Sequence, residues 1–163
     1  MKSYFKKPVL FFALLIIGFA QGQSNHRITE KILSNWQGGG KLFGQEATFS
    51  MKWENDLNNK FLKLSFKNSF IDDSSIERVM KANAYYRLNE GKGYWFDTRG
   101  MMLPLKLEVI ENSLVVFWGD EETEMGKTIY SAIDNDQIRV QDFVLKDNAF
   151  IPFGEAVYKR ATN

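Results

Sequence analysis

The chain has 163 residues, of which 44% are hydrophobic, and its 21 basic and 20 acidic residues give a net charge of +1. Without residues 1–20, which hold three lysines and no acidic residue, the charge becomes −2. A near-neutral chain lacks the clustered basic surface that nucleic acids require, so we expect no nucleic-acid partner. The absence of cysteine excludes disulfide bonds and a lipid-anchored cysteine.

The N-terminal segment predicts an export signal. Three lysines precede an uncharged apolar run over residues 9–20, which ends on the small residues Gly18 and Ala20. The run is shorter than the ~20 residues of a membrane span. We expect a signal peptide over residues 1–20, cleaved near Ala20, and a periplasmic or secreted protein with no integral membrane segment in the mature chain. An uncleaved N-terminal anchor is the alternative.

A short helix is expected at the start of the mature chain. Apolar side chains recur there at helical spacing, at Ile28, Ile32, Leu33 and Trp36. Glycines at 38–40 end the pattern. Because so short a helix is not stable alone, its apolar face should cover the open end of a barrel.

From residue 37 to residue 160, short runs alternate apolar and polar residues and are separated by turn signals, as in antiparallel strands. The expected strands are 37–43, 47–54, 62–67, 80–88, 93–97, 103–109, 114–118, 128–133, 137–145 and 153–160. Short turns favour an up-and-down barrel, which leaves no exposed edge. We therefore predict an all-β fold: one domain over residues 21–163, a single antiparallel up-and-down barrel of eight to ten strands with a short N-terminal helix.

Strand parity predicts the side chains that face the interior. They are Phe49, Met51, Leu64, Phe66, Tyr86, Leu105, Leu107, Val116, Trp118, Tyr130 and Val140. If the larger rings surround an unfilled centre, the cavity would suit an elongated or planar apolar molecule.

Three charged residues are candidates for contact with a ligand. Asp97 and Arg99 follow an aromatic segment, where they would either anchor a polar ligand group or pin a strand end as an ion pair. Asp142 shares strand parity with apolar residues and would face the interior, unless a bulge turns it to solvent. The candidate ligand-binding residues are Tyr86, Trp95, Asp97, Arg99, Trp118, Tyr130 and Asp142.

Catalytic and metal chemistry finds little support in the sequence. The single histidine, His26, lies near the mature N-terminus, and zinc or copper sites need several His or Cys ligands. The acidic residues 120–124 lack the spacing of a calcium loop and are typical of a solvated hairpin end. Asp97 could pair with Asp142 or Glu155 for acid–base work, but spacing alone does not bring them together. We expect no enzyme, no catalytic residue, no metal and no cofactor.

Two features resemble the calycin group, which includes lipocalins and fatty-acid-binding proteins. Trp36 lies at the first strand, and the last strand ends in Tyr158-Lys159-Arg160. In that group a Trp near the first strand packs beneath a basic residue of the last strand and closes one end of the barrel. The resemblance implies that Trp36 packs on Arg160, with Lys159 as the alternative.

Nearly the whole mature chain is also similar to exported bacterial proteins with a lipocalin-like barrel. The similar segments are 93–100, 103–105, 118–119, 124–130, 153–154 and Tyr158. A neighbouring barrel family binds haem through a histidine close to the C-terminal strand, where this chain has Glu155, Ala156 and Val157, so haem is not expected.

The resemblance implies an exported barrel that binds a small hydrophobic or amphipathic molecule. The alternatives are an exported structural or envelope-interaction protein with a filled barrel and no ligand, and a cofactor-free enzyme. The sequence indicates no oligomeric state.

Overall fold

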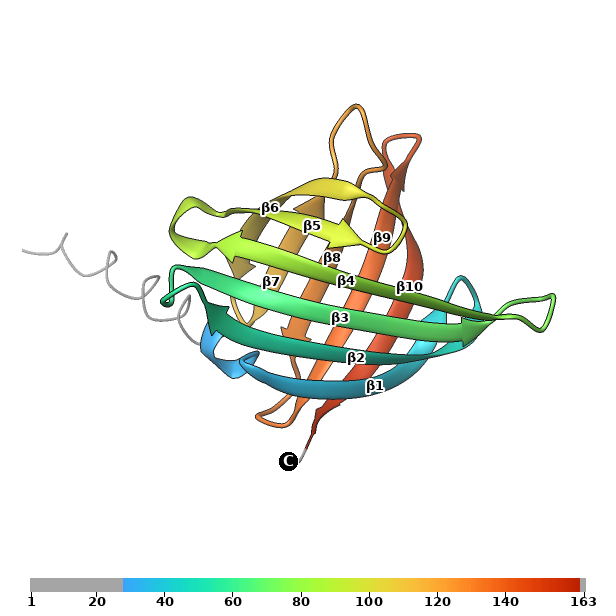
Figure 1. Ribbon diagram of the computed structural model, residues 1–163, viewed down its shortest axis with the longest axis horizontal. Coiled ribbons are helices and arrows are strands. Elements are labelled where there is room, and N and C mark those ends of the chain that lie inside the picture. The colour runs from blue at the N-terminus through green and yellow to red at the C-terminus, as the bar shows by residue number, and fades with distance from the viewer. Residues whose placement is uncertain (1–27, 162–163) are drawn as a thin grey trace, which may run out of the picture.

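The computed structural model describes residues 28–161 and forms a closed barrel of ten antiparallel strands (Figure 1). Each strand pairs with its neighbours in sequence, and β1 pairs with β10 to close the barrel. The predicted all-β, up-and-down barrel is therefore confirmed. The expected signal peptide over residues 1–20, its cleavage site and His26 lie outside the described residues.

The strands follow one another with short connections. They are β1 (Ser34–Leu42), β2 (Gln45–Asp56), β3 (Phe61–Ile71), β4 (Glu77–Arg87), β5 (Lys92–Asp97), β6 (Met102–Ile110), β7 (Ser113–Trp118), β8 (Gly126–Ala132), β9 (Gln137–Lys146) and β10 (Ala149–Arg160). A single 3₁₀ turn, η1 (Leu88–Glu90), connects β4 to β5.

Alternation in the sequence becomes alternation of burial in the barrel. In β2, Ala47, Phe49, Met51 and Trp53 are all buried, and the polar residues between them lie on the outer face. Because one face of each strand must cover the interior, a slip of one residue would bring polar groups inward. This constraint fixes the register of β2 against both β1 and β3.

The N-terminal end of the described chain closes one end of the barrel. Residues 28–31 are helical, a shorter stretch than the expected helix, and Ile28 and Ile32 are fully buried. The indole Nε1 of Trp36 donates a 2.7 Å hydrogen bond to the carbonyl oxygen of Ile32. Trp36 itself lies in β1, so the helical turn is fastened to the first strand directly.

The three glycines at 38–40 lie inside β1, and all three pair with β10. A Cβ on Gly38 would lie 2.7 Å from the carbonyl oxygen of Val157, and one on Gly40 would collide with the backbone of Glu155. A Cβ on Gly39 would meet no heavy atom closer than 3.9 Å. Two of the three glycines therefore let the first and last strands pack closely where the barrel closes.

Among residues 28–161 there is no helix with the length and hydropathy needed to cross a membrane.

Candidate functional site: the barrel interior

The barrel interior contains a cavity of about 690 Å³. It opens at the end of the barrel that carries the β1–β2, β3–β4, β5–β6 and β7–β8 connections, because residues from each of these ends line it. Helical residues 28–31, Trp36 and Arg160 occupy the opposite end. The cavity exceeds the ~300 Å³ at which pockets begin to hold small ligands.

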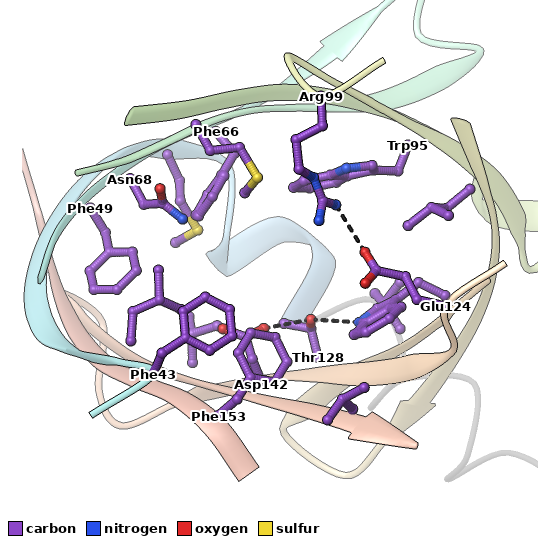
Figure 2. A pocket seen from close by; sticks show the side chains of 18 of the residues that line it. Phe43, Phe49, Phe66, Asn68, Trp95, Arg99, Glu124, Thr128, Asp142 and Phe153 are labelled. Atoms are coloured by element: carbon purple, nitrogen blue, oxygen red, sulfur yellow. Dashed lines mark hydrogen bonds and ion pairs between the residues drawn. The ribbon is translucent and has the colours of Figure 1, made fainter. Parts of the chain in front are cut away.

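Apolar side chains make most of the cavity wall, and many of them are aromatic (Figure 2). Tyr86 and Tyr130 line its inner end. Both pack on Trp53, which stacks on Tyr86 at 5.4 Å and meets Tyr130 edge-on at 5.2 Å. Burial raises the pKa of both tyrosines well above the ordinary value, so their hydroxyls stay protonated. Nearer the opening, Phe43 stacks on Phe153 at 5.2 Å. The wall therefore suits an apolar body, and the tyrosine hydroxyls offer neutral polar contacts.

Asp142 is the acidic residue of the inner wall. It lies on β9 and is half-buried, with its remaining surface turned toward the cavity that it lines. Thr128 Oγ1 donates a 2.6 Å hydrogen bond to Asp142 Oδ1 and accepts a 3.3 Å bond from Trp118 Nε1 (Figure 2). Desolvation raises the pKa of Asp142 to about 6, although the Thr128 bond opposes that rise.

A bulge lies beside Asp142, but on the partner strand. The register of β10 against β9 shifts between Pro152 and Gly154, so that Gly154 faces Asp142. A Cβ on Gly154 would lie 3.0 Å from Asp142 Oδ2. The sequence did not decide whether the Asp142 carboxyl faces the interior or the solvent. In the structure it faces the interior, and the absence of a side chain at Gly154 leaves room for the carboxyl.

Asp97 is held beneath the rim by its neighbours. Its side chain has no exposed surface and accepts bonds from Arg99 Nη2 at 2.7 Å, Arg99 N at 2.8 Å and Trp95 Nε1 at 3.1 Å. Desolvation raises the pKa of Asp97, but the bonds from Arg99 and Trp95 outweigh it, so the pKa lies below its ordinary value. Asp97 is not among the residues that line the cavity, and its role is to fix the turn after β5.

Arg99 reaches the opening of the cavity. Its side chain is half-exposed, and Nη2 forms a second ion pair of 3.0 Å with Glu124 of the β7–β8 loop (Figure 2). Asp97 and Glu124 together raise the pKa of Arg99, which stays charged. The pair joins two loops at the rim of the cavity, and sequence reasoning missed Glu124 because nothing local marks it among the acidic residues 120–124.

A second missed residue is Asn68, which lines the cavity from β3. It is 5% exposed, and its Oδ1 has no hydrogen-bond partner among the described residues. A buried amide oxygen without a donor is costly, which suits a place where a ligand supplies one. The sequence signal was present, since Asn68 has the parity of Leu64 and Phe66, but the expected strand ended at residue 67.

Six of the seven candidate residues therefore line one cavity, namely Tyr86, Trp95, Arg99, Trp118, Tyr130 and Asp142. Their contact with a ligand remains a prediction. Glu155 lies on the outer face, where it pairs with Arg139 at 3.5 Å, so it does not join Asp142 in an acid–base pair. Within the described chain, no three His, Cys, Asp or Glu side chains are arranged to hold a metal ion.

Trp36 and Arg160 meet at the closed end. Arg160 Cζ lies 4.6 Å from the centre of the Trp36 ring system. The guanidinium also donates hydrogen bonds to the carbonyl oxygens of Lys31, Leu33 and Asn135, at 3.0, 3.3 and 2.9 Å. Arg160, and not Lys159, is the basic residue that packs on the tryptophan.

No protein-family model matches the chain, and no curated protein matches it either. Among solved structures it is similar to the S-type phycobiliprotein lyase CPES of Guillardia theta, with a TM-score of 0.55 and 9% sequence identity. The match covers 86% of this chain and 94% of that chain. At this identity the likeness shows the fold alone, which in this chain is a closed antiparallel β-barrel.

This comparison corrects one expectation. The lack of catalytic motifs led to the prediction that the protein is not an enzyme, and a barrel of the same fold that bears the name of a lyase contradicts it. The prediction failed because it relied on familiar nucleophile and metal patterns. A cavity that holds its substrate can use single polar groups, which leave no motif in the sequence.

Proposed function

We propose that the protein binds one small hydrophobic or amphipathic molecule in the interior of its barrel, and that it does so after export from the cytoplasm. The cavity of about 690 Å³ carries the first part of the proposal, because its wall is mainly apolar and aromatic with a few polar groups. The charged N-terminal segment and the apolar run over residues 9–20 support the second part.

The cavity weighs against the alternative of a filled barrel that serves only as an interaction protein. Such a barrel would place large side chains across its centre, as small barrels do. Here the bulky groups Trp118, Tyr86 and Tyr130 stand around the centre and leave it open.

Binding can be tested with N-phenyl-naphthylamine, a neutral dye whose fluorescence rises in apolar surroundings. Trp118 and Phe117 are neighbours on β7; Trp118 lines the cavity, and Phe117 contacts Phe150 and Lys106 on the outer face. We expect Trp118→Ala to weaken dye binding roughly tenfold, or ~1.4 kcal/mol. Phe117→Ala, the matched control, should leave the dissociation constant unchanged.

Circular dichroism and urea unfolding of both variants would verify that the barrel remains folded. Two results would overturn the proposal: absence of dye binding by the native protein, or equal losses in the two variants. Equal losses would indicate that the dye binds to the outer surface.

A further inference from the structure

We infer that the cavity selects ligands in which a planar apolar body carries one protonated amine, and that Asp142 receives this amine inside the barrel. The inference rests on the proposed function and names the class of ligand for the same site. It follows from three observations: the position of the carboxyl group, the lack of a basic partner, and the neutrality of the groups around it.

The position of Asp142 makes its carboxyl accessible only from within. Its strand parity turns it to the interior, and it lines the cavity together with Thr128 and Trp118. The chain of hydrogen bonds from Trp118 Nε1 through Thr128 Oγ1 ends on Oδ1. The indole of Trp118 can only donate a hydrogen bond, so the Thr128 hydroxyl accepts that bond and donates its own proton to the carboxylate. This arrangement holds the carboxylate in one orientation.

No lysine or arginine of the described chain makes an ion pair with Asp142. Two arginines line the cavity, and both are paired with other carboxylates: Arg99 with Asp97 and Glu124, and Arg78 with Asp72. Burial and the Thr128 bond alone account for the pKa of Asp142, with no contribution from a positive charge. The carboxyl therefore lies in the cavity without a counter-ion from the protein.

The groups that face Asp142 from the other strands are neutral. They are Tyr130 on β8 and Tyr158 on β10, and burial raises the pKa of each hydroxyl. The other charged groups that line the cavity are paired with each other, Arg99 with Glu124 and Arg78 with Asp72. With its pKa raised to about 6, Asp142 is mostly ionised at neutral pH. An uncompensated buried carboxylate is costly, and a ligand ammonium group would remove that cost.

The wall determines the rest of the ligand. Rings of Phe49, Phe66, Trp95 and Phe153 lie around the cavity (Figure 2), and they offer flat apolar surfaces. A planar hydrocarbon body would fill this space, while its amine would reach the carboxyl of Asp142. A ligand with a carboxylate in the same place would meet like charge, so the site should reject it.

Three probes with the same ring system test the inference: pyrenylmethylamine, pyrenylmethanol and pyrenylacetic acid. Their binding to the chain of residues 21–163, without the expected signal peptide, can be followed at pH 7.5 by pyrene fluorescence. We expect the amine to bind roughly 10- to 100-fold more tightly than the alcohol, the range typical of a hydrogen bond to a charged group, and the acid to bind most weakly. The preference for the amine should fall as the pH drops through about 6 and Asp142 becomes protonated.

Asp142→Asn should abolish the preference for the amine over the alcohol, because the variant has no carboxylate to pair with the ammonium group. Glu155→Gln, which removes a carboxylate from the outer face of the adjacent strand, is the charge-matched control and should keep the preference. Thr128→Val offers a second readout: loss of its hydrogen bond should raise the pKa of Asp142, so the pH at which the preference falls should rise.

Equal binding of the amine and the alcohol by the native protein would overturn the inference, as would an unchanged preference in Asp142→Asn. If N-phenyl-naphthylamine binds and no pyrene does, the inference fails while the proposed function stands. If neither the dye nor any pyrene binds, both fail.

Discussion

Asp142 and Asp97 show how two buried aspartates of one barrel come to differ. Asp97 accepts bonds from a guanidinium, an indole and backbone amides, and its pKa is lowered. Asp142 has one neutral hydroxyl donor, and its pKa is raised to about 6. The first carboxylate is satisfied by the protein and is structural, whereas the second is left incompletely satisfied at the surface of a cavity.

A first prediction concerns the effect of Asp142 on stability. Its folded pKa lies above its unfolded value, so the folded state binds the proton more tightly, and ionisation at neutral pH lowers the free energy of unfolding. We expect Asp142→Asn to raise that free energy at pH 7.5, by up to about 3 kcal/mol. Near pH 4.5, where native Asp142 is largely protonated, the gain should shrink.

Urea unfolding of the native protein and of the variant at both pH values measures the effect. The comparison at each pH cancels the titration of groups common to both proteins, including Asp97. A variant that is less stable than the native protein at pH 7.5 would contradict the prediction.

At the residue scale, strand parity predicted part of the candidate site, and the aromatic segment before Asp97 and Arg99 indicated the rest. Parity identifies the side of the strand on which a side chain lies, and it placed Tyr86, Trp118 and Tyr130 on the cavity wall. It could not reveal contacts between distant residues. The hydrogen bond from Thr128 to Asp142 depends on the register of β8 against β9, and the ion pair from Arg99 to Glu124 depends on the shape of two loops. Strand periodicity encodes neither.

At the scale of elements, the strands extend further toward the open end than predicted. The expected ends at residues 67 and 80 became Ile71 and Glu77, and the last strand begins at Ala149 rather than 153. Near the opening, strands face a cavity and solvent instead of a packed core. Their alternation of apolar and polar residues therefore fades, although backbone pairing continues.

The loops at the opening lead to a second prediction, on the rate of ligand release. Arg99 joins the β5–β6 turn to Glu124 of the β7–β8 loop at 3.0 Å, and both side chains lie at the rim. Glu124→Gln removes this ion pair but leaves the bond between Arg99 and Asp97. We expect N-phenyl-naphthylamine to dissociate up to about fivefold faster, since an exposed pair contributes at most ~1 kcal/mol.

Stopped-flow dilution of the dye complex measures that rate. Glu122→Gln, in the same loop and exposed, is the matched control and should leave it unchanged. High salt should reduce the difference between the native protein and Glu124→Gln, because it screens the pair. An identical rate in the native protein and Glu124→Gln at low salt would show that the pair does not restrain the opening.

At the scale of the whole molecule, the barrel has one open and one closed end, and closure relies on residues far apart in the chain. β1 and β10 meet in a regular register from Trp36 opposite Arg160 to Leu42 opposite Gly154. Closure leaves no unpaired edge in the sheet, which matters for a chain without disulfides. The sequence predicted this architecture because ten alternating segments with short turns have few other ways to cover their edges.

A last prediction tests how the closed end is held. Arg160 packs on Trp36 and donates hydrogen bonds to the carbonyl oxygens of Lys31 and Asn135, so one side chain joins the helical turn, β1 and the β8–β9 loop. We expect Arg160→Ala to lower the free energy of unfolding by on the order of 2 kcal/mol. Arg160→Lys should restore little of it, because an ammonium cannot supply the planar fork that reaches several carbonyls.

The exposed neighbour Lys159 is the control, and Lys159→Ala should stay within about 0.5 kcal/mol of the native protein. Urea unfolding measures all three variants, and the dye assay adds a second readout. Since Arg160 lies at the end opposite the opening, its loss should lower stability without changing dye affinity under conditions where the barrel is folded. If Arg160→Lys had the same free energy of unfolding as the native protein, charge alone would matter at this position. If folded Arg160→Ala bound the dye more weakly, the two ends of the barrel would be coupled.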